Sequence, residues 1–214
     1  MRLALILVVA AVAAAGLTTP SLSAPAQLTI GAQPPDLLRD RRLTLFGSIP
    51  SDRPKQVVVL EARDCGQSQY RVVARVETTA GGRWSWPYFY PGISASIRAS
   101  WNGRTSAPVR VRDRVFVELR QTGARRFAVS VRAKMSFEGK TALVQRLDPA
   151  RGWTTVARAR LTESGAPPGT SYVYSWARPT TVAVPRGSLV RAFFPAAQAR
   201  PCYLAGRSNM LRAP

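Results

Sequence analysis

The fold of this chain is indicated by a stretch that occurs twice, YRVVARV at residues 70–76 and WTTVARA at residues 153–159. Five further blocks recur in the same order and at nearly the same spacing. They are RRLTL 41–45 with RRFAV 125–129, KQVVV 55–59 with KTALV 140–144, WSW 84–86 with YSW 174–176, IRASW 97–101 with VRAFF 190–194, and GRTS 103–106 with GRSN 206–209. Such ordered self-similarity indicates repeated structural units. We therefore predict two tandem domains, at residues 27–112 and 113–214.

The repeated blocks alternate between small or apolar residues and charged ones, which is the pattern of half-buried β-strands. In the stretch 72–78, for example, Arg75 and Glu77 occupy the positions predicted to face solvent. The residues predicted to face the core are Val72, Ala74, Val76 and Thr78 in one strand, Val109 and Val111 in another, Phe127, Val129, Val131 and Ala133 in a third, and Thr155, Ala157, Ala159 and Leu161 in a fourth.

Short strands separated by turn sequences predict an all-β fold. The turns include Ala80-Gly81-Gly82 and Asn102-Gly103, which combine residues that interrupt strands. About seven short strands in roughly 90–100 residues are typical of an antiparallel β-sandwich. The alternative is one larger barrel, but each copy holds a full set of strands. The sequence therefore predicts two antiparallel β-sandwiches in tandem.

Residues 1–26 are predicted to be a secretory signal peptide. A basic start at Arg2 is followed by an apolar run over residues 3–17 and by small residues ending at Ala26. The alternative is an uncleaved membrane anchor. However, a 15-residue helix spans about 22 Å against roughly 30 Å of hydrocarbon. We expect a secreted protein, extracellular or in the cell envelope, with no stable membrane insertion once processed.

The charge of the chain predicts anionic partners. There are 31 Lys and Arg residues against 11 Asp and Glu, which gives a net charge of +20. Outside the cell such a surface attracts anionic cell-envelope polymers or glycans. Nucleic acid is not expected, because the chain has neither a recognition-helix pattern nor the basic and aromatic pattern of an RNA-binding sheet.

Several classes of catalytic and metal site are excluded by composition. The chain has no histidine and only two cysteines, so Ser-His-Asp and Cys-His catalytic sites and His-ligated or four-thiolate zinc sites are excluded. The acidic residues are scattered, without a distinguished pair for glycoside hydrolysis or an Asp-rich loop for calcium. We expect no enzymatic activity, no cofactor and no metal.

The order of the motifs resembles tandem immunoglobulin-like or fibronectin type III-like domains of secreted proteins from GC-rich bacteria. The resemblance rests on the repeated stretch 70–76, on GGRWS 81–85, IRASWNG 97–103 and VRVR 109–112, and covers about residues 27–212. It implies a sandwich fold and a role as an envelope, spacer or ligand-binding domain. It implies no catalytic residues.

The two cysteines are placed by this resemblance. On an immunoglobulin-like topology, Cys65 follows the third strand, at the end of the first domain where the last strand leaves. Cys202 lies in the final hairpin of the second domain, at the end where the chain enters it. The topology therefore implies a Cys65–Cys202 disulfide that joins the domains into a rigid rod. The alternatives are two free thiols or a bond between chains.

An aromatic row and a basic stripe are the candidate binding residues. The row consists of Trp84, Trp86, Tyr88 and Tyr90, which would share one face of a regular strand. It either packs in the core, as the partial copy at 174–176 suggests, or forms a platform for sugars. Pro87 interrupts the ladder, so we expect the strand to end at Trp86. The stripe consists of Arg110, Arg112 and Arg114, and is either a polyanion-binding face or a solvated strand surface.

These observations predict a non-catalytic secreted or envelope-associated structural or adhesion module. The alternative is a protein that binds glycans or anionic polymers. It would do so through the Arg-rich strand faces or the aromatic row at residues 84–90.

Overall fold

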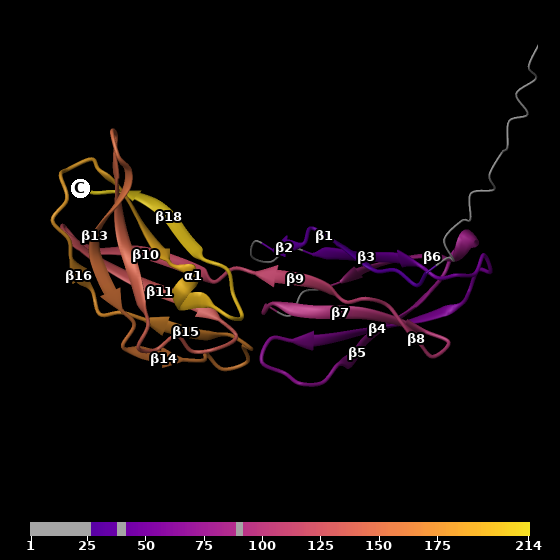
Figure 1. Cartoon of the computed structure of the whole chain (residues 1–214). Coiled ribbons are helices and arrows are strands. Elements are labelled where there is room, and N and C mark those ends of the chain that lie inside the picture. Colours follow the sequence, from indigo (N-terminus) through magenta and orange to yellow (C-terminus); the bar gives the residue numbers. More distant parts are fainter. Residues whose placement is uncertain (1–26, 38–41, 89–91) are drawn as a thin grey trace, which may run out of the picture.

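The computed structural model describes residues 27–37, 42–88 and 92–214. The predicted signal peptide lies outside these described residues. The structure is built almost entirely of strands, and nearly all of the strand pairs are antiparallel. The all-β prediction is therefore confirmed. Figure 1 shows two groups of strands end to end, a first half that contains β1–β9 and a second half that contains β10–β18.

The first half contains two sheets. One has the order β1 (Gly31–Gln33), β3 (Leu43–Ser48), β6 (Arg83–Tyr88). The other has the order β2 (Asp36–Leu37), β9 (Val109–Asp113), β7 (Ala95–Trp101), β4 (Val57–Asp64), β5 (Arg71–Glu77), with β8 (Arg104–Thr105) beside β7. A 3-10 turn, η1 (Ala80–Gly82), precedes β6.

The second half repeats this strand order. One sheet runs β10 (Phe116–Gly123), β11 (Arg126–Ala133), β15 (Val173–Trp176), β14 (Glu163–Gly165), with β16 (Thr180–Thr181) beside β11. The other runs β13 (Gly152–Arg160), β12 (Thr141–Asp148), β17 (Leu189–Phe194), β18 (Gly206–Arg212), and a short helix, α1 (Ala196–Ala199), follows β17. Without the short strands β2, β8, β14 and β16, each half pairs its first, second and fifth strands in one sheet. The fourth, third, sixth and seventh strands form the other.

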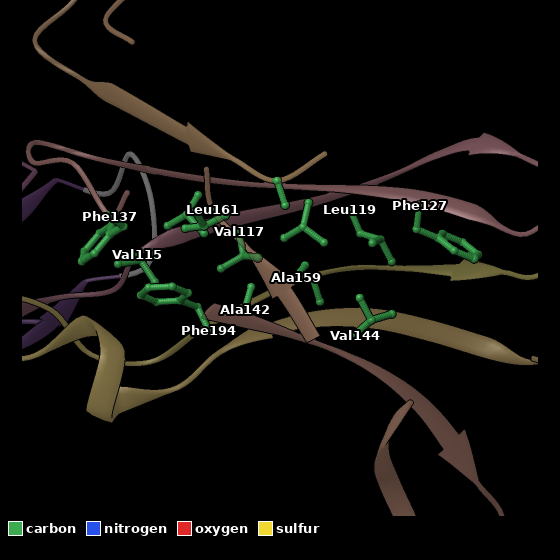
Figure 2. Packing of buried hydrophobic residues seen from close by; sticks show 14 of the residues in the cluster. Val115, Val117, Leu119, Phe127, Phe137, Ala142, Val144, Ala159, Leu161 and Phe194 are labelled. Atoms are coloured by element: carbon green, nitrogen blue, oxygen red, sulfur yellow. The ribbon is translucent and has the colours of Figure 1, made fainter. Parts of the chain in front are cut away.

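Each half has its own buried apolar cluster between its sheets. In the first half Leu43, Leu60 and Ile97 are fully buried. In the second half Phe127 and Phe194 are fully buried, and Figure 2 shows this cluster between the two layers of strands. Burying one large apolar side chain contributes roughly 1.5–3 kcal/mol. The hydrophobic energy of each half therefore comes mainly from residues of that half.

A β-bulge in the first half changes the predicted register of β5. Leu60 of β4 lies opposite Ala74, whereas the next residue, Glu61, lies opposite Val72. Val73 is thus the extra residue, and its side chain packs against the core while Val72 is 49% exposed. The prediction that Val72 faces the core is wrong, because one inserted residue reverses the alternation beyond it.

The second half has a bulge at the matching position. Val144 lies opposite Ala157, and Gln145 lies opposite Thr155, so Val156 is the extra residue. Val156 packs against the core and Thr155 is exposed, which makes the inward prediction for Thr155 wrong as well. The other predicted inward residues are buried or partly buried, as expected. The bulge is therefore part of the duplicated fold.

Two adjacent valines test this register directly. We expect Val73→Asp to cost about 2 kcal/mol or more of unfolding free energy, because it moves a carboxylate toward the core. Val72→Asp should cost within about 0.5 kcal/mol, as for other surface changes. Urea unfolding of the two variants measures both values. A larger loss in the Val72 variant would contradict the bulge.

Candidate functional site

The aromatic row does not form one exposed platform in the first half. Trp84 is 3% exposed and belongs to the core cluster, whereas Trp86, which lies opposite Leu45, is 37% exposed. Tyr88 is the last residue of β6, and Tyr90 lies outside the described residues. The expectation that the strand ends at Trp86 is wrong. β6 is an edge strand, where a proline such as Pro87 is tolerated.

The matching residues of the second half point the other way. Ser175 is fully buried, and its Oγ accepts a hydrogen bond from the backbone N–H of Phe137 at 2.8 Å. Its neighbours Tyr174 and Trp176 therefore lie on the outer face of the sheet. The prediction that residues 84–86 and 174–176 share a packing role is wrong. Trp84 faces the core in the first half, whereas the aligned Tyr174 faces outward in the second half.

Tyr174 is one of three aromatic residues around Arg132, an arginine that sequence reasoning missed, and its ring centre lies 5.9 Å from the guanidinium carbon. The guanidinium carbon of Arg132 lies 4.9 Å from the ring centres of both Phe116 and Tyr172. Trp176 Nε1 donates a hydrogen bond to Glu163 at 3.0 Å. The alternation of aromatic residues along 172–176 was the available signal.

The Cys65–Cys202 disulfide joins the two halves, which confirms the predicted bond. Its Cα atoms are 5.4 Å apart, and its cysteines are 137 residues apart in sequence. This Cα separation lies in the usual range for disulfides. Next to it, the N–H of Ser94 donates to the carbonyl of Cys202 at 3.3 Å. The covalent bond is thus accompanied by backbone contact between the halves.

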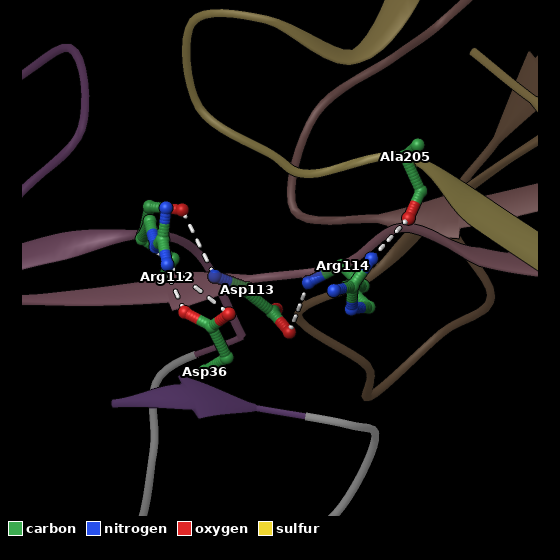
Figure 3. A network of polar contacts seen from close by, with 6 residues as sticks. Asp36, Arg112, Asp113, Arg114 and Ala205 are labelled. Carbon is green, nitrogen blue, oxygen red and sulfur yellow. Dashed lines mark hydrogen bonds and ion pairs between the residues drawn. The ribbon is translucent and has the colours of Figure 1, made fainter. Parts of the chain in front are cut away.

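The linker between the halves is held by backbone pairing. Leu204 N–H donates to the carbonyl of Asp113 at 2.7 Å, and Val115 N–H donates to the carbonyl of Leu204 at 3.4 Å. Arg114 Nη1 donates to the carbonyl of Ala205 at 3.1 Å, and the Arg114 N–H donates to the Asp113 carboxylate at 2.8 Å. Figure 3 shows these side-chain contacts as one network across the junction.

Tyr203 connects the halves through its hydroxyl group. The group donates a hydrogen bond to the carbonyl of Gly92 in the first half at 2.9 Å. It also accepts one from the N–H of Lys134 in the second half at 2.9 Å. The side chain is buried with its ring against Phe137, and burial raises the pKa of the Tyr203 hydroxyl.

The basic stripe is divided between two hollows at this junction. Arg110 and Arg112 line one hollow, here called the disulfide hollow, together with Arg63, Arg200 and Cys65. Arg114 lines the other, here called the β18 hollow, together with Arg191 and Arg207. Each has a volume of about 560 Å³. The stripe is therefore not one continuous face.

Two acidic residues near the stripe, Asp36 and Asp64, already form ion pairs with arginines. Arg112 holds Asp36 in a two-pronged ion pair, with Nε to Oδ1 at 2.8 Å and Nη2 to Oδ2 at 3.2 Å (Figure 3). Asp64 forms an ion pair with Arg71 at 3.3 Å. Arg110 and Arg114 have no acidic ion-pair partner among the described residues.

An arginine of the first half is fully neutralised by its neighbours. Arg98 Nε donates to Glu61 Oε2 at 2.9 Å, and the guanidinium carbon lies 4.1 Å from the ring centre of Tyr70. Ser100 donates to the same carboxylate oxygen at 2.8 Å. The hydrogen bond from Arg98 is the main reason that the pKa of Glu61 lies below its usual value. The group of Arg98, Glu61 and Tyr70 has a counterpart in the second half.

Within the described part of the chain, no three His, Cys, Asp or Glu side chains form a group that could hold a metal ion. Among the same residues, no helix has the length and apolar character that crossing a bilayer requires.

No protein-family model matches this chain, and no curated protein matches it. Among solved structures it is similar to the crystal structure of a tetra-tandem repeat in the extending region of a large adhesion protein. That likeness has a TM-score of 0.33 and 14% sequence identity. It covers 87% of this chain and 48% of the other, so the chain spans about half the length of that structure.

Removing the disulfide should lower stability without preventing either half from forming. For the Cys65→Ser/Cys202→Ser variant we expect a loss of up to roughly 5 kcal/mol, because the bond closes a loop of 137 residues. Urea unfolding of the oxidised protein and the variant measures the difference. Free thiols in the exported, unreduced protein, detected by mass spectrometry, would contradict the bond.

Removing one hydroxyl should test the Tyr203 contact. We expect Tyr203→Phe to cost about 2 kcal/mol, because it leaves the partly buried N–H of Lys134 and the buried carbonyl of Gly92 without their partner. Tyr172→Phe is the matched control and should cost within about 0.5 kcal/mol.

The stability difference between the wild type and Tyr203→Phe should depend on pH. Because the pKa of Tyr203 is raised in the native state, its unfolded form ionises first, near pH 10. The stabilisation is complete below that pH and is lost as the pH rises above it. The stability gap between wild type and Tyr203→Phe should therefore narrow above about pH 10. A constant gap would contradict a buried hydroxyl.

Proposed function

We propose that this protein is a secreted or envelope-associated structural module, made of two tandem immunoglobulin-like sandwiches, that acts in adhesion or spacing outside the cell. Support comes first from the strand order. In both halves the first, second and fifth strands form one sheet, and the fourth strand extends the sheet of the third, sixth and seventh. Immunoglobulin-like domains place their first, second and fifth strands in one sheet and their third, sixth and seventh in the other. This chain shares that division, but its fourth strand lies beside the third rather than in the first sheet.

The observation that carries the proposal is the fastened junction. Domains joined in one chain usually move relative to each other. Here a disulfide, the Tyr203 hydroxyl and paired linker backbone all join the halves. A unit fastened in this way keeps its two ends at a fixed separation, as a spacer or adhesion stalk requires.

The proposal that the protein is exported is supported by the disulfide and by the sequence before Gln27. Disulfides persist in secreted and envelope proteins, where the environment is oxidising. The apolar run at residues 3–17 and the small residues ending at Ala26 fit a signal that is removed on export. The exported form would then keep a net charge of +19, since only Arg2 is lost.

A second candidate function is the binding of anionic envelope polymers. It is favoured by arginines at the junction that lack an acidic partner among the described residues, Arg114 and Arg191 among them. Long-range attraction of this kind is weakened by salt.

We expect the full-length chain, expressed in a bacterium, to be exported with its N-terminus at or near Gln27 and with Cys65 bonded to Cys202. N-terminal sequencing and non-reducing mass spectrometry check these two points.

Small-angle X-ray scattering of the exported protein should fit one elongated particle of fixed shape. Intact Met1 in a membrane fraction would overturn export, and independently moving halves would overturn the rigid module.

A further inference from the structure

The β18 hollow has the size and lining of a small-ligand site. Its volume of about 560 Å³ lies in the range of about 300–1,000 Å³ that is usual for such sites. Arg114, Arg191 and Arg207 supply positive charge, and Phe116 and Phe193 supply aromatic surface. Asp36 is the one carboxylate among the described residues that line it, and both of its oxygens bind Arg112.

Arg191 is held in one orientation. Its Nε donates to Gln145 Oε1 at 2.9 Å, and its guanidinium carbon lies 4.0 Å from the ring centre of Trp153. These contacts leave both Nη groups without a hydrogen-bond partner among the described residues. A guanidinium that is already oriented loses little entropy when it binds an anion.

The repeat shows what this arginine lacks. The repeat aligns Arg191 with Arg98 and Trp153 with Tyr70. Strand pairing matches the acceptors, because Glu61 lies opposite Arg98 and Gln145 lies opposite Arg191, although the sequence blocks alone would align Arg146 with Glu61. The geometry is the same in both, with an Nε bond of 2.9 Å and a ring at about 4 Å. The carboxylate of Glu61 is replaced by the neutral amide of Gln145, which has the same shape. The second copy therefore keeps the contacts and loses the counter-charge.

The uncompensated charge is visible in the electrostatics of the hollow. Partial burial, and then repulsion from nearby Arg207, lower the pKa of Arg191. None of the described acidic residues forms an ion pair with Arg191 or Arg207. A bound anion would counterbalance the cost of burial and offset the repulsion from Arg207, because it restores the opposite charge that Glu61 supplies in the first half.

We propose that the β18 hollow binds an acidic sugar of an anionic polysaccharide, with Arg191 and Arg207 on its carboxylate and the side chain of Phe193 against its ring. The inference rests on the second candidate function and names its site. Guanidinium groups match carboxylates in two-pronged geometry. Phe193 offers apolar surface on which the carbon face of a sugar packs, whereas the ring of Phe116 is already in contact with Arg132. A sugar acid fits both features, whereas a free anion uses only the charge.

The decisive variant restores the missing charge and keeps every arginine. With the exported, oxidised protein, calorimetry should show saturable binding of a galacturonic acid hexamer at low salt, and little binding of cellohexaose. We expect Gln145→Glu to weaken binding at least about tenfold, because the new carboxylate neutralises Arg191 as Glu61 neutralises Arg98. Gln121→Glu, on an exposed residue of β10, is the matched control and should change binding less than about twofold.

Arginine variants provide a second measurement. Arg191→Gln and Arg207→Gln should each weaken hexamer binding at least about tenfold. The double variant Arg158→Gln/Arg160→Gln, on exposed residues of β13, should have less than about a twofold effect. Circular dichroism shows whether each variant keeps its strand content. Inorganic phosphate, tested alone, should bind far more weakly than the hexamer.

The outcomes separate the site from the function. Equal weakening by the control variants would show that only net charge matters, which overturns the site and leaves polymer binding in place. Phosphate binding as tight as hexamer binding would overturn recognition of a sugar. Absence of hexamer binding by the wild type would overturn both the site and the second candidate function. The proposals of export and of a rigid module would then stand unaffected.

Discussion

The attachment of residues 202–205 to the first half is the constraint on which the rest of the structure depends. The disulfide holds Cys202, the Tyr203 hydroxyl reaches Gly92, and Leu204 pairs with the linker at Asp113. Each contact brings the final hairpin of the second half against the end of the first. Both hollows of the junction exist because of this attachment, since each is lined by residues from both halves. Binding chemistry at the junction is therefore a property of the pair of halves.

The two halves share the features that determine the fold and differ on their solvent-facing surfaces. Strand order and the bulge between the third and fourth strands are the same in both halves, because a bulge decides which residues enter the core. The outward faces differ. β15 turns Tyr174 and Trp176 outward, whereas β6 of the first half buries Trp84. A side chain on the outer face is free to change without cost to packing.

Much of the fold could be predicted from the sequence, because alternation and repetition are local signals. They indicated an all-β chain with a common strand set, and topology placed Cys65 near Cys202. The bulge could not be predicted from the alternation. Val72 and Val73 are both valines, so the sequence does not show which of the two faces the core. The β18 hollow was also missed. Arg191 and Arg207 lie on the paired strands β17 and β18, but Arg114 joins them from the linker only in the folded structure, and no sequence pattern marks the three as a group.

The repeat offers an internal comparison that a single domain would not. In the first half the arginine, the aromatic ring and the carboxylate form a closed set whose charges cancel. In the second half the arginine and the ring remain in place, but the acceptor is neutral. The stacking on Trp153 and the bond to Gln145 maintain the position of Arg191, so loss of the carboxylate leaves its charge available and its geometry intact. A ligand that binds there contacts groups held together by the junction, and by linkage it stabilises the junction in return.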